Sequence, residues 1–429
     1  MSITQANSQV DRNYRLTLKK GTIRLDLKPT GGTLLVNGIK ASEPLVLDAT
    51  IEHRLTYMKT GFYSKTQSVV LGVGEEKQIS LHLKAMMGRV EIVSSPLATV
   101  WIDGKQVGVS PFNQDLLAIP HAITVKKPGY RSVVKMVTPK GDTVQKISVA
   151  LLTEEAARLK EAPGEIILKN GIKLKLYKVQ EGLIMGAPRS ETGQRANEFQ
   201  HNIRLTKSFY ASLFEITNGQ FAKFNPKKAV GPAKTPVTLI SWQEAAAFCN
   251  WLSVQDQLRP FYKMANGIVT GFNGHGDGFR LLSEGEWEWL ARKAGKKKQT
   301  QFVWGNARVI PPQTANIADE SARGQVTFFV PNYSDGYAGV APVGSFDAES
   351  SGLYDMAGNV SEWVHDIYSI VPPQTDATVY NPLGKPQGHS HVVKGANWRS
   401  GTITTLRPAF REGLTKGRDD VGFRIGRYL

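Results

Sequence analysis

The chain is poor in the residues and runs that most readily identify a function. Its 429 residues include one cysteine, Cys249, which excludes an internal disulfide and a cysteine-rich metal site. No apolar run approaches the ~18 residues of a membrane-spanning helix, and residues 1–15 lack the apolar core of an export signal. We expect a periplasmic or cell-surface protein if an export segment was removed, and a cytoplasmic protein otherwise.

The single cysteine lies in the segment Phe248–Leu252, on a predicted amphipathic helix. A thiol in that setting is more often a small buried apolar group than a reactive one. We therefore expect Cys249 to pack in a core.

The chain carries a net charge of +16, from 53 Lys and Arg against 37 Asp and Glu. The basic excess is denser in the first 150 residues, and it favours electrostatic contact of that part with anionic lipid or glycan. The basic residues are scattered and form no cluster interleaved with aromatic residues. Nucleic acid is therefore not the expected partner.

The first 150 residues contain an approximate repeat. Residues 29–38 end in Asn37-Gly38 and residues 95–104 end in Asp103-Gly104, and both pairs are hairpin-turn signals between alternating apolar residues. A second turn, read as KTGF in one copy and KPGY in the other, follows each hairpin. The two copies, over about 22–152, resemble PEGA domains, which are small β-sandwich modules found in envelope proteins.

The predicted organisation is multidomain. It comprises an N-terminal tail (1–21), two all-β sandwich modules (22–86 and 87–152), a helical linker (153–164) that Thr153 caps, and an α+β, loop-rich domain (165–429). In the last domain, helices are predicted at Trp242–Ser253 after Ser241 and at Ser283–Lys293, where Ser283 and Glu286 have capping-box spacing. Loops as long as the remaining ones are unusual in a compact domain unless something fixes them, which favours bound ions.

The segment Gly352–Trp363, GLYDMAGNVSEW, resembles the GLYDMxGNVxEW signature of the formylglycine-generating enzyme, or sulfatase-modifying factor, family. Other elements of that family's pattern follow in order across about 265 residues of the chain. They are MG (185–186), FEITNGQF (214–221), PV to FCNWL (236–252), RLLSEGEWE (280–288), FVWG (302–305), KGANW (394–398), RPAFR (407–411) and GFR (422–424). The resemblance implies a loop-rich variant of the C-type lectin fold.

The resemblance also implies two structural calcium ions. The first set of ligands would be the Asn316 side chain, the Ile317 carbonyl, the Asp335 side chain and the Tyr337 carbonyl. The second would be Asp355, the carbonyls of Gly358 and Val360, and Glu362. Such mixtures of carboxylate and carbonyl oxygen suit Ca²⁺. In the alternative interpretation, Asp335 and Asp355 only cap turns.

The catalytic ligands of the family have no counterpart here. Its enzymes hold copper with two cysteines, and counting back from Arg407 places Trp398 and Ile403 at those positions. Neither residue can supply a thiolate to a copper ion. The iron-dependent branch uses an HxxxHxE set, which the eight histidines do not form. We therefore expect no copper or iron and no copper-dependent oxidation of a substrate cysteine.

The resemblance implies that the segment from Trp398 to Asp420 covers the family's catalytic pocket, and its composition is that of a binding hot spot. The predicted contact residues are Trp398, Arg399, Thr402, Thr404, Arg418 and Asp419. In the alternative interpretation, Trp398 fills the space of the missing cysteines and Arg411 pairs inside the fold. Glu284 and Glu288 share one face of a predicted helix, where we expect a structural role over general acid–base chemistry.

Together these features predict a non-catalytic, calcium-stabilised binding or scaffolding protein of the bacterial envelope or a secretion-linked assembly. Its partner would be a protein or a glycan. The alternative is an oxidase or oxygenase with a different metal centre, for which His389 and His391 are the candidate ligands, since they would share one strand face.

Overall fold

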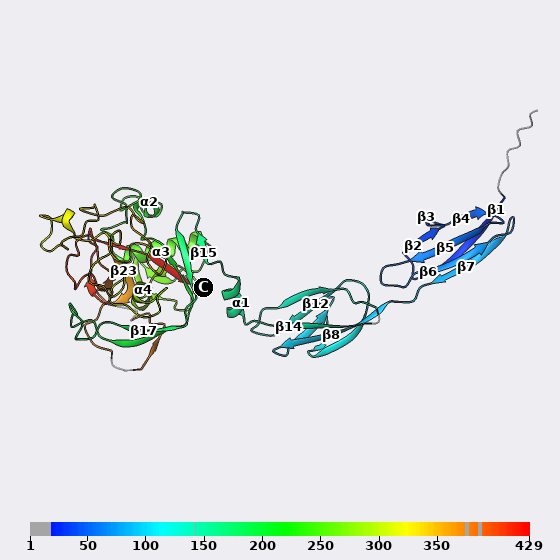
Figure 1. Cartoon of the computed structure of the whole chain (residues 1–429), viewed down its shortest axis with the longest axis horizontal. Helices are drawn as coiled ribbons and strands as arrows, with labels where there is room; N and C mark the ends of the chain where they lie inside the picture. Colours follow the sequence, from blue (N-terminus) through cyan, green and yellow to red (C-terminus); the bar gives the residue numbers. More distant parts are fainter. Residues whose placement is uncertain (1–18, 142, 374–376, 385–387) are drawn as a thin grey trace, which may run out of the picture. The chain divides into compact units, whose positions relative to one another are not determined.

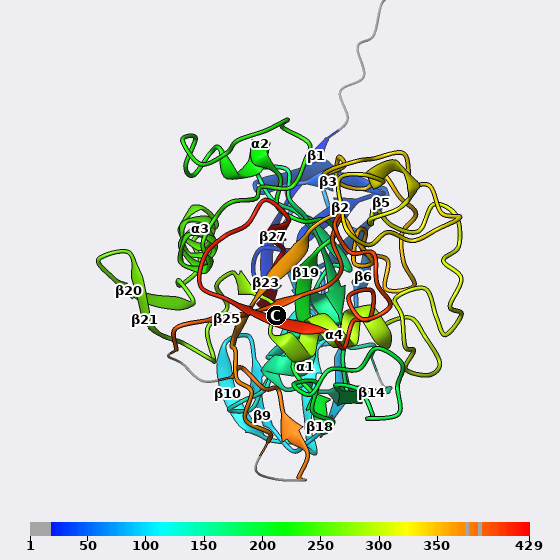
Figure 2. The ribbon, with the colours of Figure 1, turned by 90° about the vertical axis from the view of Figure 1, so that its left-hand side faces the viewer.

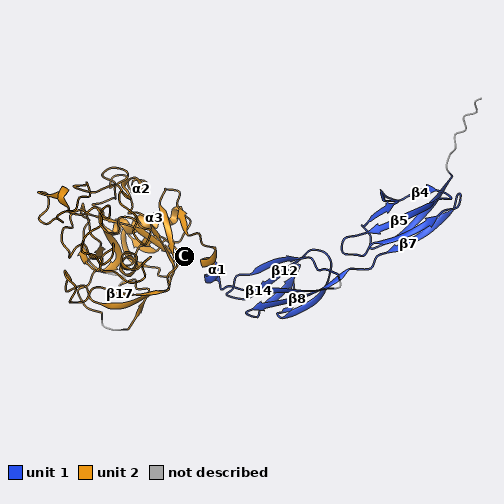
Figure 3. Ribbon diagram, viewed as in Figure 1, with its two compact units in different colours: residues 1–157 blue, residues 158–429 orange. Residues whose placement is uncertain are grey.

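The computed structural model describes residues 19–141, 143–373, 377–384 and 388–429. The chain divides into two compact units, residues 1–157 and residues 158–429 (Figure 3). The predicted tail, 1–21, lies outside the described residues except for its last three. Within the described part, no helix has both the length and the apolar character needed to span a membrane.

Unit 1 begins with a seven-stranded β-repeat built from two sheets (Figure 1). One sheet has the order β4-β1-β7 and the other β3-β2-β5-β6. Alternating apolar side chains of both sheets form one buried cluster that includes Ile23, Leu55 and Leu81. The strands are β1 (Lys20–Lys28), β2 (Thr33–Val36), β3 (Ile39–Ala41), β4 (Leu45–Asp48), β5 (Glu52–Met58), β6 (Lys65–Val70) and β7 (Glu76–His82).

A second repeat follows with the same strand order, β11-β8-β14 and β10-β9-β12-β13, around a buried cluster that includes Val90 and Val100. In both repeats the first and last strands pair in parallel, β1 with β7 and β8 with β14. The strands are β8 (Met87–Ser95), β9 (Thr99–Ile102), β10 (Lys105–Val109), β11 (Phe112–Leu117), β12 (His121–Lys126), β13 (Val133–Val137) and β14 (Val144–Ala150).

The two hairpin turns have the geometry that their sequences predict. Asn37 and Gly38 have φ of 50° and 85°, and Asp103 and Gly104 have φ of 48° and 80°. A two-residue turn of this hand requires positive φ at both positions, which Asn-Gly and Asp-Gly accept at little cost. The sequence repeat is therefore a structural repeat.

The linker is the helix α1 (Glu154–Glu161), and the Thr153 hydroxyl accepts a hydrogen bond from the Ala156 amide at 3.1 Å. The described residues of unit 2 then form four sheets, ordered β15-β16-β19-β28-β22, β17-β18-β24, β26-β25-β23-β27 and β20-β21. The first strands are β15 (Glu165–Ile167), β16 (Lys173–Tyr177), β17 (Glu181–Met185), β18 (His201–Leu205), β19 (Phe209–Ser212), β20 (Tyr262–Ala265), β21 (Ile268–Phe272) and β22 (Arg280–Leu281). The later ones are β23 (Ser361–Ile367), β24 (Val379–Tyr380), β25 (His391–Lys394), β26 (Arg411–Leu414), β27 (Val421–Phe423) and β28 (Ile425–Tyr428).

Three α-helices of unit 2 begin at capping boxes. They are α2 (Asn218–Phe221) after Thr217, α3 (Trp242–Gln255) after Ser241, and α4 (Glu284–Arg292) after Ser283. In each, the cap hydroxyl accepts from the third amide and the side chain there accepts from the cap amide. This confirms the predicted caps of α3 and α4.

Helix α4 lies at the centre of unit 2, where it packs against β17, β23 and β25. All nine of its residues are buried. Two large apolar clusters fill the unit, one around Trp287 and Phe209 and one around Phe248 and Phe423. Cys249 lies in the second cluster, as expected, and burial raises the pKa of its thiol.

Between α4 and β23 the chain is nearly all loop, drawn in yellow at the right of Figure 2. Over residues 293–360 the one helical turn is η1 (Glu320–Ala322). Polar side chains hold these loops together from within, including Asn316, Asp319, Asp335 and Asn359. The predicted loop-rich character of this part is confirmed.

Candidate binding pocket

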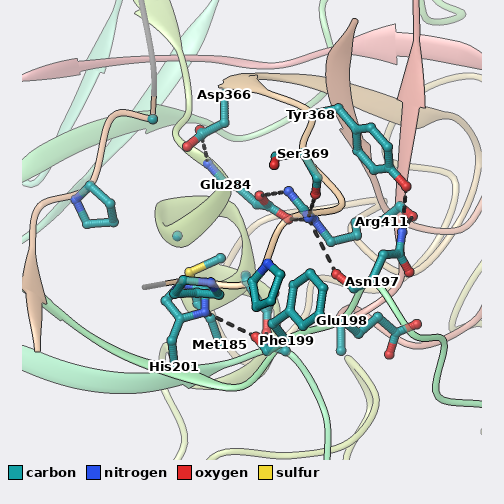
Figure 4. A pocket seen from close by; sticks show the side chains of 18 of the residues that line it. Met185, Asn197, Glu198, Phe199, His201, Glu284, Asp366, Tyr368, Ser369 and Arg411 are labelled. Atoms are coloured by element: carbon teal, nitrogen blue, oxygen red, sulfur yellow. Dashed lines mark hydrogen bonds and ion pairs between the residues drawn. The ribbon is translucent and has the colours of Figure 1, made fainter. Parts of the chain in front are cut away.

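A pocket of about 660 Å³ opens beside the N-terminus of α4 (Figure 4). Its wall is formed by the end of β17, the segment leading into β18, the first turn of α4, the end of β23 and the start of β26. This volume lies in the usual range for ligand sites. The polar lining residues are Asn197, Glu198, His201, Glu284, Glu288, Asp366, Tyr368, Ser369 and Arg411.

The pocket wall is held by ion pairs that are almost completely buried. Arg411 donates from Nε and Nη2 to the two carboxylate oxygens of Glu284, at 2.7 and 2.8 Å. The Lys394 ammonium, 0% exposed, lies 3.0 Å from Glu288 and 3.6 Å from Glu284. The interpretation of Arg411 as a residue that pairs inside the fold is therefore confirmed, and Glu284 and Glu288 have structural partners.

Asp366 differs from the other carboxylates of the pocket. Its Oδ2 accepts from the backbone amide of Glu284 at 2.6 Å, at the first turn of α4. Burial, followed by the negative charge of Glu284, raises the pKa of Asp366 to about 7. Among the described residues no Lys, Arg or His forms an ion pair with it.

The predicted partner-binding residues lie outside the pocket lining. Arg399 is exposed, pairs with Asp419 and stacks over the Trp398 ring at 4.1 Å. Arg418 instead pairs with Glu412 and Asp420, at 3.0 and 2.8 Å. Thr402 and Thr404 are half-buried, and none of these residues lines the pocket. From this segment the pocket takes Ala409 and Arg411.

The first predicted calcium set contains an oxygen that fits a cation. The Oδ1 of Asn316 is buried and has no hydrogen-bond partner, while its amide nitrogen donates to Gly339 and Asn359. Asp335 accepts from the amides of Ile317 and Tyr337, both at 2.8 Å. Asp319, which is fully buried, accepts from the Asp335 amide.

These neighbours have opposing effects on the pKa of Asp335. Burial, together with the nearby charge of Asp319, raises the pKa of Asp335 to about 6, although the two backbone hydrogen bonds lower it. Two adjacent carboxylates and an unpartnered amide oxygen are the chemistry that Ca²⁺ takes. Asp319 was not among the predicted ligands.

The second set fits a calcium ion less well. Both carboxylate oxygens of Glu362 accept from Arg424 at 2.8 Å, and one also accepts from Trp287. Asp355 has one oxygen bonded to the Gly344 amide and one buried without a partner. Arg424 therefore already neutralises the Glu362 charge.

Two further carboxyl groups lie near Asp355. Both oxygens of Glu215 and one of Glu349 are buried without a partner. Burial, followed by the charge of Asp355, raises the pKa of Glu349 to about 8 and that of Glu215 well above its ordinary value. In the described part of the chain, no three such acidic, His or Cys side chains are arranged to hold a metal.

The two histidines of the alternative metal site lie in different surroundings. His391 is buried and stacks on Trp242, with ring centroids 3.6 Å apart, whereas His389 is exposed. Burial lowers the pKa of His391 to about 4.

The chain matches two known protein families. The family profile described as "Sulfatase-modifying factor enzyme 1-like domain" matches residues 154–429. The chain belongs to this family. The profile of the PEGA domain matches residues 87–155, the second β-repeat of this sulfatase-modifying-factor-like chain. The predicted resemblance of the C-terminal domain to this family and that of the second β-repeat to the PEGA domain are thereby confirmed.

Curated relatives match parts of the chain. "Chaperone protein LppX" of Paenibacillus barcinonensis is 27% identical over 224 residues, which cover 47% of this chain and 73% of the relative. The "Formylglycine-generating enzyme" of Thermomonospora curvata is 32% identical, over 38% of this chain and 44% of the relative. The mouse "Inactive C-alpha-formylglycine-generating enzyme 2" is 30% identical, over 44% and 48%. The chain spans less than half the length of the formylglycine-generating enzymes that it matches.

Two solved structures are also similar to parts of the chain. "Treponema denticola variable protein 1" is 21% identical with a TM-score of 0.49, covering 62% of this chain and all of that chain. PvdO from Pseudomonas aeruginosa is 21% identical with a TM-score of 0.46, covering 63% of this family member and all of PvdO.

The sequence did not predict the pocket. Asp366 and His201 lie outside the quoted motif positions, and Glu284 was assigned a structural role. The one available signal was the charged motif at 280–288, which holds Arg280, Glu284, Glu286 and Glu288 in a segment that is otherwise apolar. Charged residues in a buried helix need partners, and one of those partners, Arg411, lines the pocket.

Proposed function

We propose that this chain is a non-catalytic binding protein that holds its partner in the pocket beside α4. The observation that carries the proposal is the pocket itself, whose wall is fixed by buried ion pairs and contains no cysteine. Fixed side chains around a cavity favour binding without reorganisation. The names of two relatives, an inactive family enzyme and a chaperone, agree with such a role.

The partner in this proposal is a protein or glycan of the bacterial envelope or of a secretion-linked assembly. Unit 2 would adopt the C-type lectin variant that the family resemblance implies, and the two β-repeats would be sandwich modules that display it. Calcium is a structural part of the proposal. Asn316, Asp335 and the carbonyls of Ile317 and Tyr337 would hold the first ion, with Asp319 beside them.

Metal content and reactivity together test this proposal. We expect purified chain to carry calcium and no stoichiometric copper or iron. We also expect no aldehyde when the chain is incubated with copper, oxygen and a cysteine-containing peptide, because Trp398 and Ile403 stand where the family's cysteines are expected. Aldehyde formation, or one equivalent of tightly held copper or iron, would support the oxidase alternative and overturn the proposal.

A second candidate surface is the stacked pair Trp398–Arg399 with Asp419. Trp398 is half-buried and Arg399 lies over its ring, and a Trp paired with an Arg is typical of interface hot spots. Capture from native envelope extracts by wild type and by Trp398→Ala plus Arg399→Ala tests it. Loss of a specific partner with the double variant would assign binding to this surface, whereas unchanged capture would exclude it.

A further inference from the structure

Asp366 and His201, two hydrogen-bond acceptors that line the pocket, form no ion pair with any other described residue. Among the other carboxylates of the wall, Glu198 is paired with Arg407, Glu284 with Arg411, and Glu288 with Lys394. Asp366 is 8% exposed and has no such partner among the described residues. One of its oxygens accepts from the helix amide, so the other remains to accept from a ligand.

His201 is the second acceptor. Its Nδ1 lies 3.1 Å from the carbonyl oxygen of Phe199, which can only accept, so Nδ1 carries the hydrogen of the neutral ring. Its Nε2 is then an acceptor, and the ring lines the same pocket as Asp366 (Figure 4). A ligand that enters between them meets acceptors and a carboxyl group.

The rim of the pocket is apolar. Val371, Pro372, Pro373 and Pro382 line it, and Val371 is 61% exposed. Ile370, next in the chain, is 69% exposed. Exposed apolar side chains beside a cavity are a typical contact surface for a protein partner.

We propose that the pocket receives the cationic side chain of a lysine or arginine from a partner protein, while apolar neighbours of that side chain pack on the rim Val371–Pro373. This inference rests on the proposed function, because it names the partner of the same pocket. Charge complementarity selects this occupant. An ammonium or guanidinium group would supply both the missing donors and the missing positive charge. An anionic group would face Asp366, and a neutral sugar would leave its charge unbalanced.

The protonation of Asp366 agrees with this occupant. The charged groups that act on it are Glu284 and Glu286 of α4, which raise its pKa, and Arg411 of β26, which lowers it. His201 of β18 lines the same pocket. A bound cation favours the carboxylate, so we expect cation binding to release a proton near neutral pH.

Small probes separate the possible occupants. Ligand-observed saturation-transfer NMR on the full chain would compare n-butylammonium and n-butylguanidinium with butanol, butyrate and a methyl glycoside. We expect binding of the two cations and none of the other three. Preferential binding of butyrate, butanol or the glycoside would overturn the inference.

Two variants test whether the cation binds in the pocket. Asp366→Asn keeps the shape and the acceptor for the Glu284 amide, and we expect it to weaken cation binding about tenfold or more. Asp347→Asn, the same change at an exposed carboxylate outside the pocket, should have no effect. Equal affinity of wild type and Asp366→Asn would overturn the inference.

A matched pair at the rim keeps the test independent of folding. Val371 is exposed, so Val371→Lys and Val371→Glu alter charge at the mouth with little cost to the fold. The lysine variant should weaken cation binding and the glutamate variant should strengthen it, and both effects should shrink as salt is added. Identical affinities of the two variants would overturn the inference. If the two cations do not bind, and the chain forms no aldehyde and holds no copper or iron, this inference is wrong but the proposed function stands. Aldehyde formation would remove the proposed function.

Discussion

At the scale of single residues, Arg407 is a buried charge whose two terminal nitrogens are held by neighbouring oxygens. Its guanidinium, 0% exposed, donates to both oxygens of Glu198 at 2.7 Å and to Glu191 at 2.9 Å. A fourth hydrogen bond reaches the carbonyl oxygen of Gly193. These bonds fix the segment that leads into β18 and so shape one wall of the pocket.

Replacing Arg407 should be costly because two carboxylates would stay behind without a counter-charge. We expect Arg407→Met to lower the free energy of unfolding by about 3–5 kcal/mol. The exposed pair Arg399–Asp419 supplies the control, and Arg399→Met should cost at most about 1 kcal/mol. Urea unfolding curves of both variants measure the loss of unfolding free energy. Equal losses would contradict the role of Arg407 as a buried counter-charge.

Asp366 predicts a pH dependence of stability. Its pKa is about 7 in the folded chain and about 3.9 in an unfolded one, so the folded state binds its proton more tightly. The stability that this proton confers is complete below pH ~4 and is lost as the pH rises through 7. The free energy of unfolding should fall less steeply between pH 4 and 7 in Asp366→Asn than in wild type. Urea titrations at several pH values measure this free energy. The prediction is wrong if wild type and Asp366→Asn show the same dependence on pH.

The residues that sequence reasoning found are those whose role is set by near neighbours. Asn37-Gly38 and Ser283 with Glu286 act over two to four positions, and both have the predicted geometry. Asp366 meets the Glu284 amide across 82 positions, and His201 lines the same pocket from β18. Only the fold brings such groups together, so no local pattern predicts that they form a pocket.

At the scale of elements, the start of α4 couples the fold to the pocket. The Ser283 hydroxyl accepts from the Glu286 amide at 3.1 Å, and the Glu286 carboxylate accepts from the Ser283 amide. The same carboxylate accepts from Nη1 and Nη2 of Arg280, at 2.6 and 2.7 Å. The capping box is therefore continuous with a fully buried ion pair. The Glu284 amide that holds Asp366 belongs to the same turn.

Two substitutions should separate the contribution of the capping box from that of the buried ion pair. Ser283→Ala removes one cap bond and should cost about 1 kcal/mol, whereas Glu286→Gln leaves Arg280 without its counter-charge and should cost about 3–5 kcal/mol. Ser241→Ala, at the cap of α3, is the matched control and should also cost about 1 kcal/mol. Chemical denaturation gives all three values, and a Glu286→Gln cost no larger than that of Ser283→Ala would exclude the coupling.

The elements of unit 2 were predictable where a helix has a capping box and an apolar face. Its strands were not, because several are only two to four residues long and lie between loops. Short strands such as β22 and β24 carry too few residues to show alternation. In the two β-repeats, longer strands and hairpin turns made the repeat visible.

At the scale of the whole molecule, calcium should stabilise unit 2 and leave unit 1 unaffected. All of the predicted ligands lie in residues 316–362, within unit 2. At free calcium of about 100 times the dissociation constant, one site adds ~2.7 kcal/mol. Calorimetry of the full chain with calcium and with a chelator should therefore move only the transition of unit 2.

One variant tests whether the stabilising calcium ion binds at the first predicted site. Asp335→Asn should abolish most of the calcium response, because Asp335 belongs to the first set, where the unpartnered Asn316 oxygen lies. Asp347→Asn, an exposed carboxylate in the same loop region, should preserve the response. A midpoint that chelation leaves unchanged in wild type would exclude calcium as a structural ion.

Each β-repeat of unit 1 begins and ends on neighbouring strands that run the same way, β1 beside β7 and β8 beside β14. The chain therefore enters a repeat at one end of a sheet and leaves it at the other. A pull along the chain would load the ladder between those two strands in shear, so that its hydrogen bonds would have to break together. We therefore expect each of the two repeats to resist tension along the chain through this ladder.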